Sequence, residues 1–308
     1  MKPMLAKTGS RDILSSKQYY FEPKLDGTRA LLYAKGKKLQ FINRRERDIT
    51  YRFPEFRNFK IDAKSCVLDG EIIVYDKKGF PSFSLLQMRD QLEKKVMIEI
   101  RSRQMPATYV VFDILEKDGK KLVNLPYLKR KVILEQTVHE NEHLELCFYT
   151  RNGKKLWSQI QKSKMEGVMA KHKDSGYFCG KRSEEWLKIK NLKTIDVVIA
   201  GFSQEKRKIS ALCMAVYKNG RLYYIGRVGT GFTEKFLDEL YSKLHTIIQK
   251  KIPVVNPPKN WQKHNIKWLK PEYVAEVRYL DISKDKILRV PAFLRLRYDK
   301  PVKDCVFE

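Results

Sequence analysis

The sequence predicts a two-domain α+β protein, in which a domain of mixed strands and helices precedes a small β-barrel. The first observation is size: 308 residues exceed a typical single domain, and 43% hydrophobic with 11% aromatic residues is enough for packed cores. The second is a change of pattern near residue 192, from alternating strand-like and helix-like segments to short strands around one helix. We therefore place the domains at residues 1–192 and 193–308.

Runs of β-branched and aromatic residues predict strands in the first domain, and helical spacing predicts helices between them. The predicted strands are Val67–Tyr75, Tyr109–Leu115, a segment that starts at Glu166, and Trp186–Lys190. The predicted helices are Pro126–His139 and Gly153–Lys164. Pro126 suits the first turn of the earlier helix.

The second domain reads as strands, one helix and more strands. Strands are predicted at Asp196–Phe202, Ala211–Tyr217, Arg221–Val228 and Tyr273–Ile282. Asn219-Gly220 between two apolar runs is a strong hairpin signal. Thr233 is the expected N-cap of a helix whose apolar stripe runs from Phe236 to Ile248. This order suits a small barrel such as an OB fold.

The charge points to a polyanionic partner. There are 63 Lys and Arg against 36 Asp and Glu, a net charge of +27, and both predicted domains are basic. Nucleic acid is the usual partner of such a chain, and the alternative is an ordinary Lys-rich surface. The chain has no apolar run long enough to span a membrane, and its start lacks the apolar block of a secretory signal, so we expect a cytoplasmic protein. The five cysteines, without a CxxC pair, are expected to be reduced thiols.

The segment Glu22-Pro-Lys24-Leu-Asp26-Gly27-Thr-Arg29 carries the chemistry. A lysine amine can attack an activated phosphorus and hold a nucleotide as a phosphoramidate, provided that nearby cations and partial burial help it to lose its proton. Gly27 permits a close turn, and Arg29 can pair with a phosphate. Taken alone, the segment is equally a turn with a solvated lysine.

Lys24–Arg29 resembles motif I of the covalent nucleotidyltransferases, which comprise ATP-dependent DNA ligases, RNA ligases and mRNA capping enzymes. Further segments resemble the family's later motifs in their order: Leu68–Ile72 (motif III), Val111–Leu115 (IIIa), Glu166–Lys171 (IV), Trp186–Lys190 (V) and Phe293–Lys300 (VI). The resemblance implies a nucleotidyltransferase (adenylation) domain over 1–192 and an OB-fold domain over 193–308.

Motif VI and the segment Phe83–Arg89 are similar to those of DNA ligases. Val228–Phe232 is similar to the ligase module of bacterial Ku-associated end-joining enzymes. Ala292 stands where many ligases carry an arginine in motif VI, which removes one basic contact. The alternatives in the same superfamily are an RNA ligase or a capping enzyme. A non-catalytic DNA-binding protein with this fold is the alternative outside the enzymes.

The resemblance implies roles for residues around the nucleotide. Lys24 is the nucleophile, Glu22 reads the purine, and Phe112, which is otherwise a core residue, stacks on adenine. Trp186 and Lys171 belong to the same nucleotide-binding set. Phosphates are contacted by Arg29, Arg44 and Arg182, where Arg45 is the alternative to Arg44.

Charged residues complete the expected site. Glu71 and Glu166 hold a metal, Mg²⁺ with Mn²⁺ as the alternative, or the ribose; otherwise they make surface ion pairs. Lys188 and Lys190 alternate along one strand and stabilise charge at the α-phosphate. In the second domain, Arg297, Asp299 and Lys300 orient the pyrophosphate when that domain closes about a hinge near Asn191–Thr194.

The implied activity is that of an ATP-dependent DNA ligase in DNA repair. ATP adenylates Lys24, AMP moves to a 5′-phosphate, and the adjacent 3′-hydroxyl expels it. The expected partners are nicked or broken double-stranded DNA and a Ku-type end-binding protein, with no membrane. We expect a monomer associated with the nucleoid.

Overall fold

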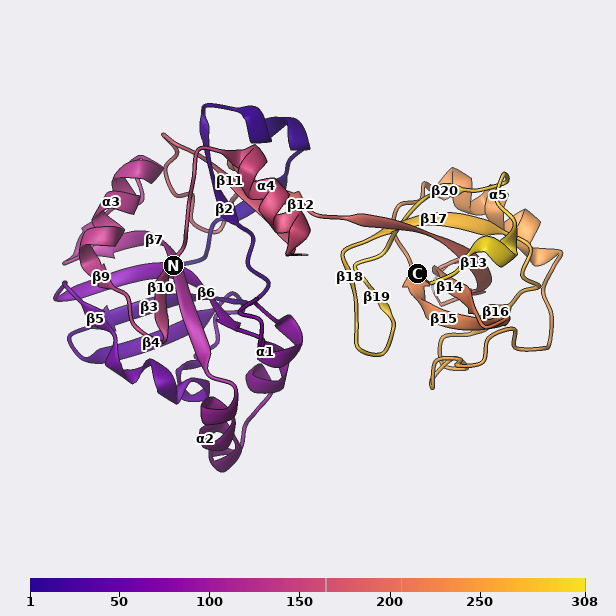
Figure 1. Ribbon diagram of the computed structural model, residues 1–308, viewed down its shortest axis with the longest axis horizontal. Helices are drawn as coiled ribbons and strands as arrows, with labels where there is room; N and C mark the ends of the chain where they lie inside the picture. Colours follow the sequence, from indigo (N-terminus) through magenta and orange to yellow (C-terminus); the bar gives the residue numbers. More distant parts are fainter. Residues whose placement is uncertain (164, 206, 308) are drawn as a thin grey trace. The chain divides into compact units, whose positions relative to one another are not determined.

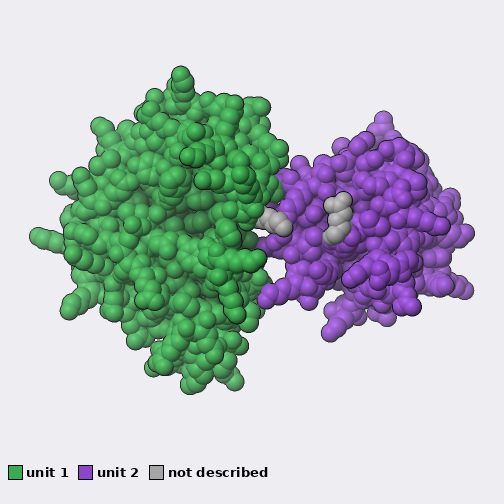
Figure 2. Space-filling model, in the orientation of Figure 1, with its two compact units in different colours: residues 1–191 green, residues 192–308 purple. Residues whose placement is uncertain are grey.

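The computed structural model describes residues 1–163, 165–205 and 207–307. The chain divides into two compact units, Met1–Asn191 and Leu192–Glu308 (Figures 1 and 2). Among the described residues, no helix combines the length and the apolar composition needed to cross a bilayer.

Unit 1 contains two main sheets (Figure 1). The larger sheet has the order β10-β7-β6-β3-β4, with β8 beside β7, and the smaller has the order β1-β12-β11-β2. Most pairs are antiparallel, but β10 runs parallel to β7 and β1 runs parallel to β12. The strand bounds are β1 Leu5–Thr8, β2 Tyr19–Pro23, β3 Thr28–Lys35, β4 Lys38–Asn43, β5 Lys60–Ile61, β6 Ser65–Val74, β7 Ala107–Lys117, β8 Lys120–Lys121, β9 Val138–His139, β10 Leu144–Leu146, β11 Gly167–His172 and β12 Arg182–Lys190.

The helices of unit 1 lie between these strands in the chain. They are η1 Arg11–Ser15, η2 Thr50–Arg52, η3 Pro54–Asn58, α1 Phe83–Asp90, α2 Lys95–Gln104, α3 Tyr127–Thr137 and α4 Gly153–Lys162. Helix α3 begins one residue later than predicted, because Pro126 occupies the N-cap position. The predicted end of α4, Lys164, lies outside the described residues. Helices α1 and α2 were not predicted, and α2 leaves Val96 and Ile100 exposed rather than forming one buried apolar stripe.

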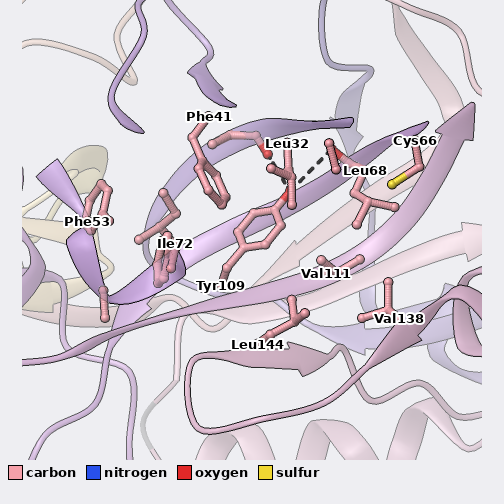
Figure 3. Close-up of a cluster of buried hydrophobic side chains, with 14 of the residues drawn as sticks. Leu32, Phe41, Phe53, Cys66, Leu68, Ile72, Tyr109, Val111, Val138 and Leu144 are labelled. Carbon is pink, nitrogen blue, oxygen red and sulfur yellow. Dashed lines mark hydrogen bonds between the residues drawn. The ribbon is translucent and has the colours of Figure 1, made fainter. Parts of the chain in front are cut away.

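The core of unit 1 is organised around Tyr109 in β7, which is completely buried (Figure 3). Its hydroxyl oxygen lies 2.9 Å from the carbonyl oxygen of Ala30 and 3.3 Å from that of Leu68. The neighbouring strand β6 must carry a glycine here, since a Cβ on Gly70 would lie 2.6 Å from the Tyr109 ring. The glycine of the Leu68–Ile72 motif is therefore explained by packing beneath the ring.

In its described residues, unit 2 has one large sheet, a separate pair of short strands, the helix α5 and the short segment η4. The sheet has the order β15-β14-β13-β17-β20, with β16 beside β13, and β18 pairs with β19. The bounds are β13 Lys193–Ser203, β14 Ala211–Lys218, β15 Arg221–Val228, α5 Glu234–His245, β16 Ile266–Trp268, β17 Val274–Tyr279, β18 Asp281–Ile282, β19 Leu288–Arg289, β20 Ala292–Leu296 and η4 Val302–Asp304. Leu237, Leu240 and Leu244 of α5 pack into the core of the sheet.

Several predictions for unit 2 are confirmed in detail. Asn219 and Gly220 both have positive φ, as a two-residue hairpin turn between β14 and β15 requires. The Thr233 hydroxyl accepts a hydrogen bond from the backbone N–H of Phe236 at 3.2 Å and so caps α5.

The helix ends at His245, earlier than the apolar stripe suggested, and the predicted strand Tyr273–Ile282 is interrupted at Leu280.

The predicted α+β class is confirmed: both units are mixed and consist mostly of sheet. The expected barrel is not closed in the described residues, because the strand path ends at β15 on one side and at β20 on the other. A register shift between Ile199 and Gly201 in β13 accompanies its pairing with three different strands.

We expect Gly70→Ala to lower the free energy of unfolding by about 1–3 kcal/mol, because the added methyl group collides with the Tyr109 ring. Urea denaturation measures this. Gly229→Ala is the matched control, since its nearest neighbour would be 3.2 Å away and the change should be smaller. Equal losses at the two positions would contradict this account of the core.

Candidate active site

A cavity of about 240 Å³ opens in unit 1 where the chain passes from the smaller sheet to the larger one. The loop after β2 enters it and leads into β3. Strands β6 and β7 of the larger sheet and β1, β11 and β12 of the smaller sheet also contribute side chains. The predicted site residues that line the cavity are Glu22, Lys24, Arg29, Arg44, Glu71, Phe112, Lys171, Arg182, Trp186 and Lys188. Segments far apart in the sequence thus meet at one cavity.

Lys24 lies in the loop after β2 and is held there by contacts with the start of β11. Its backbone N–H donates to the carbonyl of Gly167 at 2.9 Å, and its ammonium group pairs with the Glu166 carboxylate. Both side chains are mostly buried, with exposed fractions of 20% and 9%. Gly167 is required here, because a Cβ would lie 2.1 Å from the carbonyl oxygen of Ile189. The predicted nucleophile and one predicted metal ligand are therefore in direct contact.

Gly27 brings the loop close to the larger sheet. A Cβ at this position would lie 2.3 Å from the carbonyl oxygen of Ile72 and 2.7 Å from Cγ of Glu71. The sequence reading of a close turn thus has a specific cause: the loop passes directly over Glu71.

Arg29 is fixed by a buried carboxylate. Its Nε and Nη2 donate to the two oxygens of Asp69 at 3.0 and 2.6 Å, and Nη1 donates to the carbonyl of Met4. Burial alone would lower the pKa of Arg29, but Asp69 more than reverses this and the pKa is raised. The Tyr177 hydroxyl donates to the same Asp69 at 2.6 Å. Arg29 is thus a rigid, permanent cation at the cavity wall, and sequence reasoning missed Asp69 and Tyr177 as its supports.

Glu71 is a carboxylate in an unfavourable place. Burial raises its pKa to about 8, and the nearby Asp69 and Glu166 add to the effect, while Arg29 and Lys24 partly offset it. A bound cation would favour the charged carboxylate and so offset this cost of burial. In the described residues no three His, Cys, Asp or Glu side chains cluster as a metal site. Two carboxylates that share an ion with substrate phosphates are, however, the usual arrangement for Mg²⁺.

Cations from β12 face Lys24. Lys188 has a lowered pKa, because it is partly buried and lies near Arg182, Lys190 and Lys24. Two of the site residues predicted in this unit, Lys190 and Glu166, are absent from the described lining of the cavity. Lys190 still contributes positive charge next to Lys188. Such a concentration of like charge is favourable only when an anion is present.

The inner part of the cavity is built from Glu22 and aromatic rings. Glu22 is 2% exposed, and its Oε2 lies 2.6 Å from Nζ of Lys171. That ammonium group lies 4.2 Å from the ring centroids of both Phe112 and Trp186, which meet edge to face. Phe112 is therefore both a wall of the cavity and a partner of a buried cation.

The structure distinguishes Arg44 from Arg45, which were the two alternatives for one phosphate contact. Both side chains are exposed, but Arg44 lines the cavity and Arg45 is absent from the described lining. The remaining predicted residues belong to unit 2, where Arg297 donates to Asp299 at 2.9 and 2.8 Å. Arg297 also donates to Asp196, as does Lys300 at 2.8 Å. Sequence reasoning did not single out Asp196, since one acidic residue in an apolar strand carries no motif.

Comparisons with known proteins agree on one family. Residues 3–190 match the family model described as ATP dependent DNA ligase domain, and residues 190–300 match the one described as ATP dependent DNA ligase C terminal region. The chain is 34% identical over 312 residues to the multifunctional non-homologous end joining protein LigD of Mycolicibacterium smegmatis, covering 99% of this chain and 39% of that protein. It is 31% identical to a DNA ligase of Archaeoglobus fulgidus, covering 92% of this chain and 52% of that one.

Solved structures give the same result. One described as mycobacterial DNA ligase D complexed with ATP and MES is 32% identical, with a TM-score of 0.57, and covers 100% of this chain and 98% of that chain. The ligase domain of LigD from M. tuberculosis has a TM-score of 0.55 at the same identity. The chain spans about two fifths of the length of the LigD proteins that it matches.

We expect Glu71→Gln to stabilise the ligand-free protein, and more so as the pH rises. The carboxyl pKa is raised from 4.5 to about 8 in the folded state, so between these values the folded protein binds more protons than the unfolded chain. The free energy of unfolding of the wild type therefore falls as the pH rises from 4.5 to about 8, and Glu71→Gln removes this pH dependence. Melting temperatures at pH 5 and pH 8.5 should diverge between the two proteins. Parallel pH dependences would contradict the assignment.

Proposed function

Since the chain belongs to the family of ATP-dependent DNA ligases, we propose that it seals breaks in double-stranded DNA through an AMP group carried covalently on Lys24. The observation that carries the proposal is the position of the Lys24 amine. It lies inside a cavity lined with cations and in contact with a carboxylate. We further propose that residues 1–192 act as the adenylation domain and residues 193–308 as the OB-fold domain.

In the first step, Nζ of Lys24 attacks the α-phosphorus of ATP. An N–P bond forms, the bond to the bridging oxygen breaks, and pyrophosphate leaves with the electron pair. Glu166 contacts Nζ and is the base available to accept its proton. Glu22 receives the purine, while Phe112 and Trp186 supply apolar ring surface for it.

Charge that develops on the phosphates is met by fixed cations. Arg29, Arg44, Arg182, Lys171 and Lys188 reach the cavity, and Lys190 adds its charge from the same strand as Lys188. Preorganised charges of this kind are the largest expected term in phosphoryl transfer. Glu71 and Glu166 are the residues that would hold Mg²⁺, or Mn²⁺ in its place, and the ion would neutralise phosphate oxygens.

In the second step the 5′-phosphate of DNA attacks the lysyl-AMP, the N–P bond breaks and Lys24 regains its proton. In the third step the oxygen of the adjacent 3′-hydroxyl attacks the 5′-phosphorus of the DNA-adenylate and releases its proton to solvent. A P–O bond forms, the P–O bond to AMP breaks, and AMP leaves. We assign Arg297, Asp299 and Lys300 to orienting the pyrophosphate in the first step, with a hinge near Asn191–Thr194. Their carboxylate contacts hold the two cations in defined positions within unit 2.

The proposed partner is nicked or broken DNA, bound by a protein of net charge +27. The LigD relatives are named for non-homologous end joining, and on that ground we propose a Ku-type end-binding partner. We further propose that the ligase is a monomer and acts at the nucleoid. Retention of the purified protein on an immobilised Ku protein from the same source tests this. Without retention the end-joining context fails and the ligase activity stands.

The wild-type protein should seal a nicked duplex with ATP, but not with GTP or NAD. Lys24→Ala should lower sealing by at least about a thousandfold, because the nucleophile is gone. The same variant should still seal a nick whose 5′-phosphate already carries AMP, since that step does not need the amine. Lys17→Ala, at an exposed lysine, is the matched control and should seal normally. Equal ATP-dependent sealing by Lys24→Ala would contradict the proposal.

A further inference from the structure

The inner end of the cavity holds a buried carboxylate, Glu22, with three charged or polar partners. Glu22 Oε1 accepts a hydrogen bond from the Tyr127 hydroxyl at 2.7 Å and lies 3.5 Å from Nζ of Lys131. Its other oxygen, Oε2, lies 2.6 Å from Nζ of Lys171. All four side chains are at most 2% exposed. Two buried ammonium groups therefore face one carboxylate.

Two of these groups do not reach the cavity. Tyr127 and Lys131 stand four residues apart on α3, so they share one face of the helix. Neither is among the described residues that line the cavity, whereas Glu22 and Lys171 are. Lys131 is held in turn by the carbonyl of Cys147, to which it donates at 3.2 Å, and by the Tyr149 ring, 4.6 Å away. The pair thus acts on a ligand through the residues that it contacts, chiefly Glu22, to which both side chains are joined.

Glu22 and Lys171 both line the cavity, so the cluster offers it a carboxylate acceptor beside an ammonium donor. Nζ of Lys171 is itself buried, and its ion pair among the described residues is the one with Glu22. Adenine carries an amine donor next to a ring-nitrogen acceptor, and guanine and hypoxanthine carry a carbonyl acceptor in place of that amine. An ionised carboxylate accepts only, so it attracts the amine and repels the carbonyl.

We propose that Tyr127 and Lys131 are positioning residues that select adenine, by holding the Glu22 carboxylate in one orientation against the base. This inference rests on the proposed function, because it concerns the nucleotide that Lys24 receives. Without Tyr127 and Lys131, the Glu22 side chain can rotate, and the Lys171 ammonium group can move into the position that the carboxylate occupies. The donor and acceptor would then exchange positions, and a 6-carbonyl purine would fit.

The test compares ATP with inosine triphosphate, which differs at the position of the exocyclic amine. The rate of labelling of the protein is measured at varied nucleotide concentration for the wild type, Tyr127→Phe and Lys131→Met. For each variant we expect kcat/KM for ATP to fall about tenfold, mainly because KM rises. We expect the specificity ratio, which is kcat/KM for ATP divided by kcat/KM for inosine triphosphate, to fall at least about tenfold. Lys131→Arg should restore part of that ratio.

Tyr149→Phe is the matched control, since it removes a tyrosine hydroxyl from the same cluster while keeping the ring beside Lys131. Its ratio should match that of the wild type. Tyr127→Phe keeps the shape of a core side chain and remains informative even where Lys131→Met does not fold. An unchanged ratio in a folded Tyr127→Phe that still labels with ATP overturns this inference and leaves the ligase proposal intact. Failure of the wild type to label with any nucleotide overturns the ligase proposal itself.

Discussion

The contact between Lys24 and Glu166 is the interaction on which the rest of the site depends. It joins the loop after β2 to the start of β11, two segments that are 142 residues apart in the chain. The backbone hydrogen bond from Lys24 to Gly167 fixes the loop on the same strand. From there the chain must turn at Gly27, over Glu71, to enter the larger sheet. One amine is thereby placed between a cation-rich strand and two carboxylates.

The charges of the site are arranged for a ligand rather than for the free protein. Desolvation raises the pKa of the Glu71 carboxyl, and Lys188 lies near the cations Arg182, Lys190 and Lys24. Each arrangement is unfavourable alone and becomes favourable when phosphates and a divalent cation join it. By contrast, the pairs that lie behind the site are fully compensated. Arg130 and Asp113, both completely buried, form such a pair at 2.7 Å between α3 and β7. Compensated ion pairs behind the site therefore hold in place a cavity whose own charges are only partly compensated until a ligand binds.

Much of this site was predictable from the sequence because its parts lie in short motifs. The residue types at Lys24, Glu71, Phe112 and Lys188 were identified on that basis, and all four line one cavity. The supports were not predictable in the same way. Lys131 and Tyr127 show only the spacing of an ordinary helix, and their contacts with Glu22 arise only through the fold. Asp196 likewise gains its partners only through the fold of unit 2. The boundaries of α5 and β17 were missed because apolar spacing continues past the residues where hydrogen bonding ends.

The central claim is that the amine of Lys24 forms the bond to phosphorus. Mass spectrometry of a protease digest, made after incubation of the protein with ATP and Mg²⁺, tests it most directly. The account predicts one added AMP group, located on the peptide that contains Lys24 and released by acid as expected for an N–P bond. An AMP group on any other residue, or an unmodified Lys24 in a protein that seals DNA, would contradict it.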